Sequence, residues 1–214
     1  ARTDPAWVAG WRAGSLRAIA EADLAGDLAA LDAADRVHLI ALAPDAPADL
    51  SYLQAAWALA RDHAARGATT ILDVHAMTYW RATAVPAADA ALDLARELRV
   101  VFESSRERPG GAHALHTRGL RKLGVPDVVA LCGADDVDVV RPAITAIAAA
   151  LARGGELGAG PTPIPITAAQ TWQLAADRDG LADLLQLHNE ARVLVDASGN
   201  HLLGVAERLR AARS

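Results

Sequence analysis

The sequence is nearly devoid of cysteine, lysine and methionine. Cys132 is the only cysteine among 214 residues, so no intrachain disulfide can form, and we expect a chain that folds in the reducing cytoplasm. Lys122 is the only lysine, and arginine supplies the other basic residues. The chain begins ARTDP and its one methionine is Met77, so we expect that its start was trimmed or omitted, and a lost targeting segment stays open.

The sequence also lacks a basic excess and a long apolar run. Its formal net charge is −5, and the densest basic stretches, 106–111 and 116–122, are short and carry no interleaved aromatic residues. Phosphate binding needs concentrated Lys and Arg, so we expect no nucleic-acid partner. The longest apolar runs, such as residues 144–152, fall well short of the roughly 20 residues that span a bilayer, so we expect no membrane insertion.

Apolar residues nevertheless make up 52% of the chain, and their spacing alternates between helix-like and strand-like segments. Residues 6–31 have a helical pattern that three glycines weaken. Residues 37–43 and 69–75 are apolar runs of strand length. Between them a helix is expected over 49–67, with Asp49 able to cap its start. These segments predict a β-α-β unit with parallel strands.

The remaining chain continues this alternation. The expected segments are a short helix (87–96), a strand (98–105), an extended stretch (112–117), a strand (127–132), a helix (138–153), a linker (154–166), a strand (171–175), a helix (180–191) and a hairpin turning at 198–200. We therefore predict an α/β to α+β fold, with a mixed sheet built from β-α-β units and a C-terminal helix plus β-hairpin. Residues 1–155 would form the core with its N-terminal helical segment, and 156–214 an addition packed on the same domain.

Two of these segments, 38–67 and 127–154, resemble each other. Each has an apolar strand, an acidic turn and an alanine-rich helix that closes at Ala-Arg-Gly. An ancient internal duplication is one explanation. The other is that every strand-turn-helix segment of an alanine-rich protein looks like this.

Candidate catalytic residues lie near the expected ends of strands, the edge at which open α/β sheets usually bind ligands. Asp73 and His75 stand two residues apart, so on a strand their side chains would share one face. Such a pair could hold a divalent metal or orient an imidazole for base catalysis, and Glu103 at another strand end could serve as a general base. The structural alternatives are a histidine bonded to neighbouring backbone and a solvated strand terminus.

His113 and His116 would share a face on a helix, but the extended conformation expected here turns them to opposite faces. A joint site is therefore disfavoured, and His116 is the better single candidate because it opens a turn. The candidate metal ligands are thus Asp73, His75 and His116, and a divalent metal is the only cofactor that the sequence suggests.

Candidate binding residues are an aromatic anchor and a basic cluster. An exposed Trp80 would suit a protein partner, although burial in the core is the alternative. Arg118 and Arg121 offer an anion site beside a helix start, or simply a solvated helix face. Cys132 ends a strand expected to be buried, with acidic neighbours that raise a thiol pKa, so a thiol enzyme is excluded.

The stretches HTRGLRKLGVPDVVAL (116–131) and ARGATTILDVHAMTYW (65–80) resemble uncharacterised bacterial proteins grouped as domains of unknown function. Those proteins share a His/Thr-x-Gly and then a Gly-x-Pro-Asp/Glu turn between strands. The matching positions are His116, Thr117, Gly119, Gly124, Pro126 and Asp127. The resemblance covers residues 36–155 and implies an α+β domain without an established activity.

No convergent catalytic set emerges from these residues. The first hypothesis is therefore a non-enzymatic binding or assembly module that acts through a protein surface, with a protein partner or a second copy of itself. It requires an exposed apolar patch. The alternative is a metal-dependent, hydrolase-like enzyme whose site, at the C-terminal edge of the sheet, unites Asp73, His75, Glu103 and His116.

Overall fold

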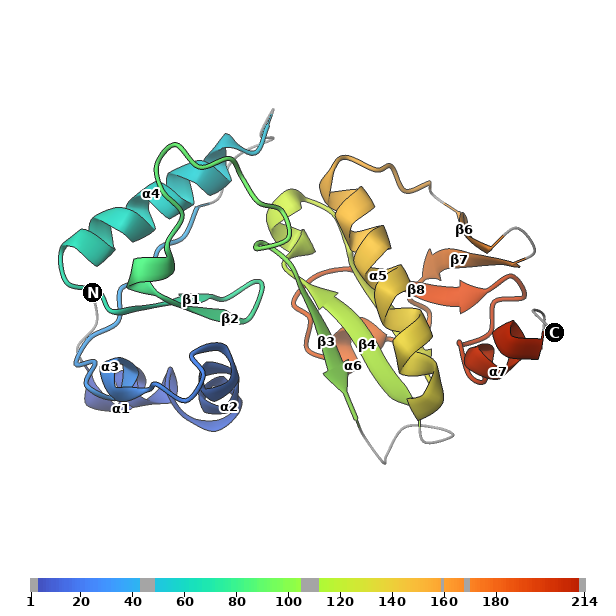
Figure 1. The fold of residues 1–214 in the computed structure, drawn as a ribbon, viewed down its shortest axis with the longest axis horizontal. Coiled ribbons are helices and arrows are strands. Elements are labelled where there is room, and N and C mark those ends of the chain that lie inside the picture. Colours follow the sequence, from blue (N-terminus) through green and yellow to red (C-terminus); the bar gives the residue numbers. More distant parts are fainter. Residues whose placement is uncertain (1–3, 43–48, 105–111, 159, 168–169, 212–214) are drawn as a thin grey trace. The chain divides into compact units, whose positions relative to one another are not determined.

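The computed structural model describes residues 4–42, 49–104, 112–158, 160–167 and 170–211. The chain forms two compact units, residues 1–93 and residues 94–214 (Figure 1). The fold is mixed α+β, as the sequence predicts, with a two-stranded sheet in the first unit and a six-stranded mixed sheet in the second. Among the residues described, no helix is long and apolar enough to cross a membrane.

The boundary between the units falls after Asp93, whereas the sequence suggests a division after residue 155. Residues 156–214 are an integral part of the second unit, because they supply β6, β7 and β8 to its sheet. The alanine-rich stretch before Leu94 carries few large apolar side chains, so its position as a boundary has no strong signature in the sequence.

The described part of the first unit contains four helices and a β-hairpin. They are α1 (Pro5–Gly10), α2 (Gly14–Asp23), α3 (Ala29–Asp32), α4 (Ser51–Ala65), β1 (Thr70–Asp73) and β2 (Thr78–Arg81), followed by the 3-10 turn η1 (Ala82–Ala84). The helical stretch 6–31 is broken near its glycines, and Gly14 and Gly26 have positive φ angles of 56° and 76°. Leu24, Leu31 and Tyr79 belong to a small core that packs these helices on the hairpin.

The predicted β-α-β unit of the first half is not formed, although its helix is present as α4. β1 pairs with β2 in antiparallel register, and residues 38–42 form no strand. A short hairpin closes a far smaller loop than a crossover does, which favours this local pairing. The duplication is not supported either, because residues 127–132 are a strand and residues 38–42 are not. The predicted helix 87–96 is also wrong, since isolated short helices are marginal in water.

The second unit is built on one sheet with the strand order β3-β4-β5-β8-β7-β6. Its strands are β3 (Arg99–Glu103), β4 (His113–Arg118), β5 (Asp127–Cys132), β6 (Thr162–Thr167), β7 (Gln170–Ala176) and β8 (Ala191–Asp196). β5 and β8 are parallel, and the other neighbours are antiparallel. The predicted strands at 98–105 and 127–132 are thus confirmed as β3 and β5, and the stretch 112–117 is extended in β4.

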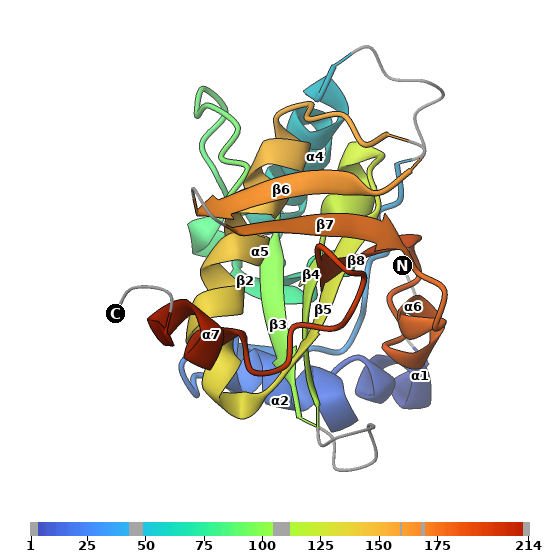
Figure 2. The same cartoon turned by 90° about the vertical axis from the view of Figure 1, so that its right-hand side faces the viewer.

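Helices cover both faces of this sheet, as Figures 1 and 2 show. The long α5 (Val137–Ala152) packs on one face, where Leu115, Ile144 and Trp172 belong to the main core. The short α6 (Leu181–Leu184) packs on the other face, in a second cluster with Val193 and Val195. The 3-10 turns η3 (Leu120–Leu123) and η4 (Ala134–Asp136) and the terminal helix α7 (Val205–Ala211) complete the unit.

Three predictions for the C-terminal part need correction. The linker 154–166 contains all but the last residue of β6, an edge strand whose Pro163 and Pro165 cannot donate to a further strand. The helix predicted over 180–191 is limited to α6, after which Gln186 and His188 adopt positive φ angles that end it. Instead of forming a terminal hairpin, β8 pairs with β5 and β7, and Leu202 bridges to Cys132.

Candidate functional site

Asp73 and His75 do not share a strand face, because β1 ends at Asp73 and His75 lies in the turn that follows. The Asp73 carboxylate accepts the backbone N–H groups of His75 and Ala76, each at 3.0 Å. This is the usual way in which Asp shapes a tight turn. The His75 side chain is exposed. In this geometry Asp73 orders the β1–β2 turn.

Glu103 and His116 are in direct contact. The register of β3 and β4 pairs Val101 with His116, and the His116 Nε2 atom lies 3.0 Å from Glu103 Oε1. The other ring nitrogen lies 3.3 Å from the Thr117 carbonyl oxygen, and the ring is fully buried. Burial lowers the pKa of His116 below its ordinary value, although Glu103 acts in the opposite direction. Both ring nitrogens thus meet protein oxygen atoms, which hold the ring in place.

The four residues of the enzyme hypothesis are divided between the two units. Asp73 and His75 belong to the first unit and Glu103 and His116 to the second, and contact is established for the latter pair. Within the described parts of the chain, no group of three or more His, Cys, Asp or Glu side chains is arranged to hold a metal ion. The metal-dependent alternative therefore stays a prediction.

The binding residues suggested by the sequence also have structural contacts. Trp80 is half-buried, and its ring meets that of Trp57 edge to face with centroids 5.9 Å apart. Arg118 donates to the carbonyl oxygens of Leu185 and Gln186, at 3.0 and 3.3 Å, and Arg121 donates to the His188 carbonyl. The two arginines thereby satisfy carbonyl groups at and beyond the end of α6, a common role of basic side chains.

The Cys132 thiol is buried, as the sequence predicts. It is fully buried at the end of β5, and burial, with a smaller contribution from Asp136, raises its pKa to about 11. A thiol with such a pKa is almost entirely protonated at neutral pH, whereas nucleophilic attack requires the thiolate.

Residues 38–42, where the sequence predicts a strand, carry three of the exposed large apolar side chains in the described part of the first unit. Residues 38–42, called here the apolar segment, have neither helix nor strand structure. Leu39, Ile40 and Leu42 are 67%, 38% and 43% exposed. Among the described residues, no backbone amide of the apolar segment donates a hydrogen bond. The segment therefore combines a strand-like sequence and exposed aliphatic side chains with backbone amides that donate to no described residue.

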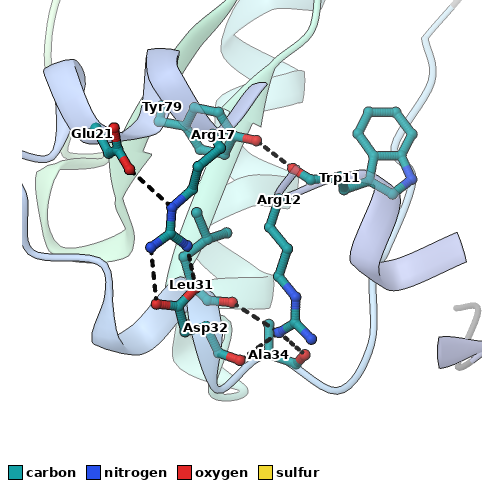
Figure 3. Close-up of polar contacts among 8 residues, drawn as sticks. All are labelled: Trp11, Arg12, Arg17, Glu21, Leu31, Asp32, Ala34 and Tyr79. Carbon is teal, nitrogen blue, oxygen red and sulfur yellow. Dashed lines mark hydrogen bonds and ion pairs between the residues drawn. The ribbon is translucent and has the colours of Figure 1, made fainter. Parts of the chain in front are cut away.

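The chain just before the apolar segment is fixed by Arg12, in the turn between α1 and α2, and by Arg17 of α2 (Figure 3). Arg12 donates to the carbonyl oxygens of Leu31 and Ala34, at 3.3 and 2.9 Å, and also to that of Asp32. The side chain of Asp32 in turn accepts from Arg17. These bonds satisfy carbonyl groups at the end of α3. They therefore hold in place the chain that directly precedes the apolar segment.

The apolar segment is also held to α4 through two imidazole rings. The ring of His38 lies against that of His63, with centroids 4.8 Å apart. Desolvation, followed by the proximity of His63, lowers the pKa of His38 below its ordinary value of about 6.5. Two neutral imidazoles can stack, whereas two imidazolium ions repel, so this contact depends on pH.

We expect the pKa of His38 to lie below 6.5 and to rise when His63 is replaced by alanine. Because the pKa is lowered in the folded chain, the stability due to this contact is complete above about pH 6.5 and is lost as the pH falls through the folded value. The effect should stay below about 1 kcal/mol because His38 is exposed. An NMR titration of the His38 ring protons measures this pKa, and a value of 6.5 or more in the unmodified chain contradicts the prediction.

Comparisons with models of known protein families, with curated proteins and with solved structures found no match to this chain.

Proposed function

We propose that the protein is an assembly module that binds a second copy of itself through the apolar segment, residues 38–42. The observation that carries this proposal is the coincidence, in one stretch, of exposed Leu39, Ile40 and Leu42 with backbone amides that donate no hydrogen bond to the described residues. An unpaired segment of strand-like sequence is a template for pairing with another chain.

A second copy suits this segment better than an unrelated partner because two identical segments complement each other when they run antiparallel. Alternate residues of each segment then exchange N–H to C=O hydrogen bonds with the other copy, and a two-fold axis closes the contact as a dimer. Composition supports this choice. The chain carries a net charge of −5, which repels copies, whereas the apolar segment has no residue charged at neutral pH.

The dimer is expected to be weak and to dissociate on dilution. Burying an exposed Leu or Ile side chain contributes roughly 1.5–3 kcal/mol, but association costs at least about 4 kcal/mol in lost translation and rotation. Two segments of this length bury far less than the roughly 1,200 Å² of a standard interface. We therefore expect a dissociation constant on the order of 1–100 μM.

Replacing Leu39 by aspartate should abolish this dimer, because a carboxylate would lie at the centre of the shared apolar contact. The matched control is Leu184→Asp in the second unit, since Leu184 is 63% exposed and Leu39 is 67% exposed. Sedimentation equilibrium between about 0.5 and 500 μM, a range that brackets the expected constant, measures the average mass.

The unmodified chain and Leu184→Asp should rise from 22.3 kDa towards twice that mass, while Leu39→Asp stays at 22.3 kDa. A monomer at every concentration overturns the proposal, and so does a dimer that Leu39→Asp leaves intact. Circular dichroism of both variants checks that each is folded as the unmodified chain is.

A further inference from the structure

A groove of about 840 Å³ lies in the second unit over β7 and β8. Its floor consists of side chains that alternate along the two strands on the face opposite α5, namely Gln173, Ala175, Val193 and Val195. Three of these four side chains are aliphatic, so the floor presents a small apolar surface beside one amide. We propose that this groove binds a small organic anion with an apolar body.

The walls of the groove come from the loop that follows β7 and the loop that follows β8. Asp179 and Arg178 lie in the loop between β7 and α6, and His201 lies in the loop that follows β8. His201 Nε2 is 3.4 Å from Asp179 Oδ2, so this pair joins the two loops. The groove thus has an apolar floor and polar walls, which is the usual construction of a ligand site.

The charges in the groove favour an anion. Three arginines, Arg178, Arg192 and Arg208, line it against two carboxylates. The acids have partners close by, because Asp179 contacts His201 and Asp196 accepts the backbone N–H groups of Ser198 and Asn200.

The arginines retain donors for a ligand. Arg192 and Arg208 each donate to a backbone carbonyl, at 3.4 and 2.7 Å, and a guanidinium carries five N–H groups. Arg178 is exposed at the rim. Guanidinium groups bind carboxylates, sulfonates and phosphates through paired hydrogen bonds, so this rim would hold the anionic end of the ligand.

The probe for this proposal is 8-anilinonaphthalene-1-sulfonate, which combines a sulfonate, an N–H group and an apolar body. Its fluorescence titration is compared between the unmodified chain, Arg178→Gln and, as matched control, Arg153→Gln, which replaces an exposed arginine outside the groove. We expect roughly 10-fold weaker binding in Arg178→Gln and no change in Arg153→Gln. The neutral analogue N-phenyl-1-naphthylamine should bind the unmodified chain at least 10-fold more weakly.

Amide shifts in NMR spectra locate the bound probe. We expect shifts in residues 173–179 and 193–201, the stretches that line the groove. Equal binding of the neutral analogue, an unchanged affinity of Arg178→Gln, or shifts confined to residues 38–42 would each overturn the proposal. This test is independent of self-association, because a Leu39→Asp chain should bind the probe as the unmodified chain does.

Discussion

Replacing Gly119 by alanine is expected to destabilise the second unit by about 3–5 kcal/mol. Gly119 has a φ angle of 104°, which L side chains rarely adopt, and it packs against the chain just before β3. A Cβ atom added there would lie 2.2 Å from the Glu97 carbonyl oxygen. Because that oxygen belongs to the backbone, the whole entry to β3 would have to move.

Gly124 provides the matched control, because it flanks the same 3-10 turn at its other end and also has a positive φ, of 72°. No atom lies within 4 Å of the Cβ that an alanine would place there. Gly124→Ala should therefore cost only about 1–2 kcal/mol, for the backbone conformation alone. Equal losses in the two variants would contradict the importance of the close approach to Glu97.

Urea denaturation measures the free energy of unfolding of both variants. Trp172 is a probe that reports on the second unit alone. The other four tryptophans, Trp7, Trp11, Trp57 and Trp80, belong to the first unit. The indole N–H resonance of Trp172, in a chain with labelled tryptophan, thus reports unfolding of the second unit separately.

Replacing Asp136 by alanine should cost the second unit about 3–5 kcal/mol. Its buried carboxylate accepts three backbone N–H groups, those of Gly133 at 3.0 Å, Gly204 at 2.7 Å and Ala206 at 2.8 Å. Each of these donors would lose its partner in a part-buried or buried setting, at about 1–3 kcal/mol each. The carboxylate also ties the start of α7 to the end of β5.

Asp135→Ala is the control, because Asp135 is exposed and lies in the same 3-10 turn. We expect that change to stay within about 0.5 kcal/mol. If Asp136→Ala and Asp135→Ala unfold at the same urea concentration, the carboxylate of Asp136 does not have the structural role that its hydrogen bonds indicate.

The sequence predicts the centre of the second unit well because β5 is buried throughout. Residues 127–132 are apolar almost throughout and form β5 with the bounds expected, since a strand covered on both faces needs no polar alternation. α5 likewise begins and ends within one residue of the prediction. In the first unit, the apolar run 37–43 satisfies the same pattern but has no neighbouring strand along residues 38–42. The spacing of apolar residues indicates which segments could form a strand. It does not indicate whether a neighbouring strand is present to pair with them.

The candidate sites were harder to predict because their residues come from segments that are far apart in the sequence. Glu103 and His116 are in contact because β3 and β4 are neighbours, and His116 lies within β4, not at the start of a turn as the sequence suggests. Asp179 and His201 were missed, since both lie in loops and belong to no recognisable motif. Their only sequence signal is that each lies in a polar loop after a strand, and most loops share that feature.

The measurement that tests self-association most directly is hydrogen–deuterium exchange of the apolar segment at two protein concentrations, about 1 μM and about 200 μM, on either side of the expected dissociation constant. Antiparallel pairing would place alternate amides of residues 38–42 in intermolecular hydrogen bonds. We therefore expect their exchange to slow at the higher concentration, while the turns of residues 87–93 exchange equally at both. Exchange in residues 38–42 that is the same at the two concentrations, whether fast or slow, would contradict pairing between copies.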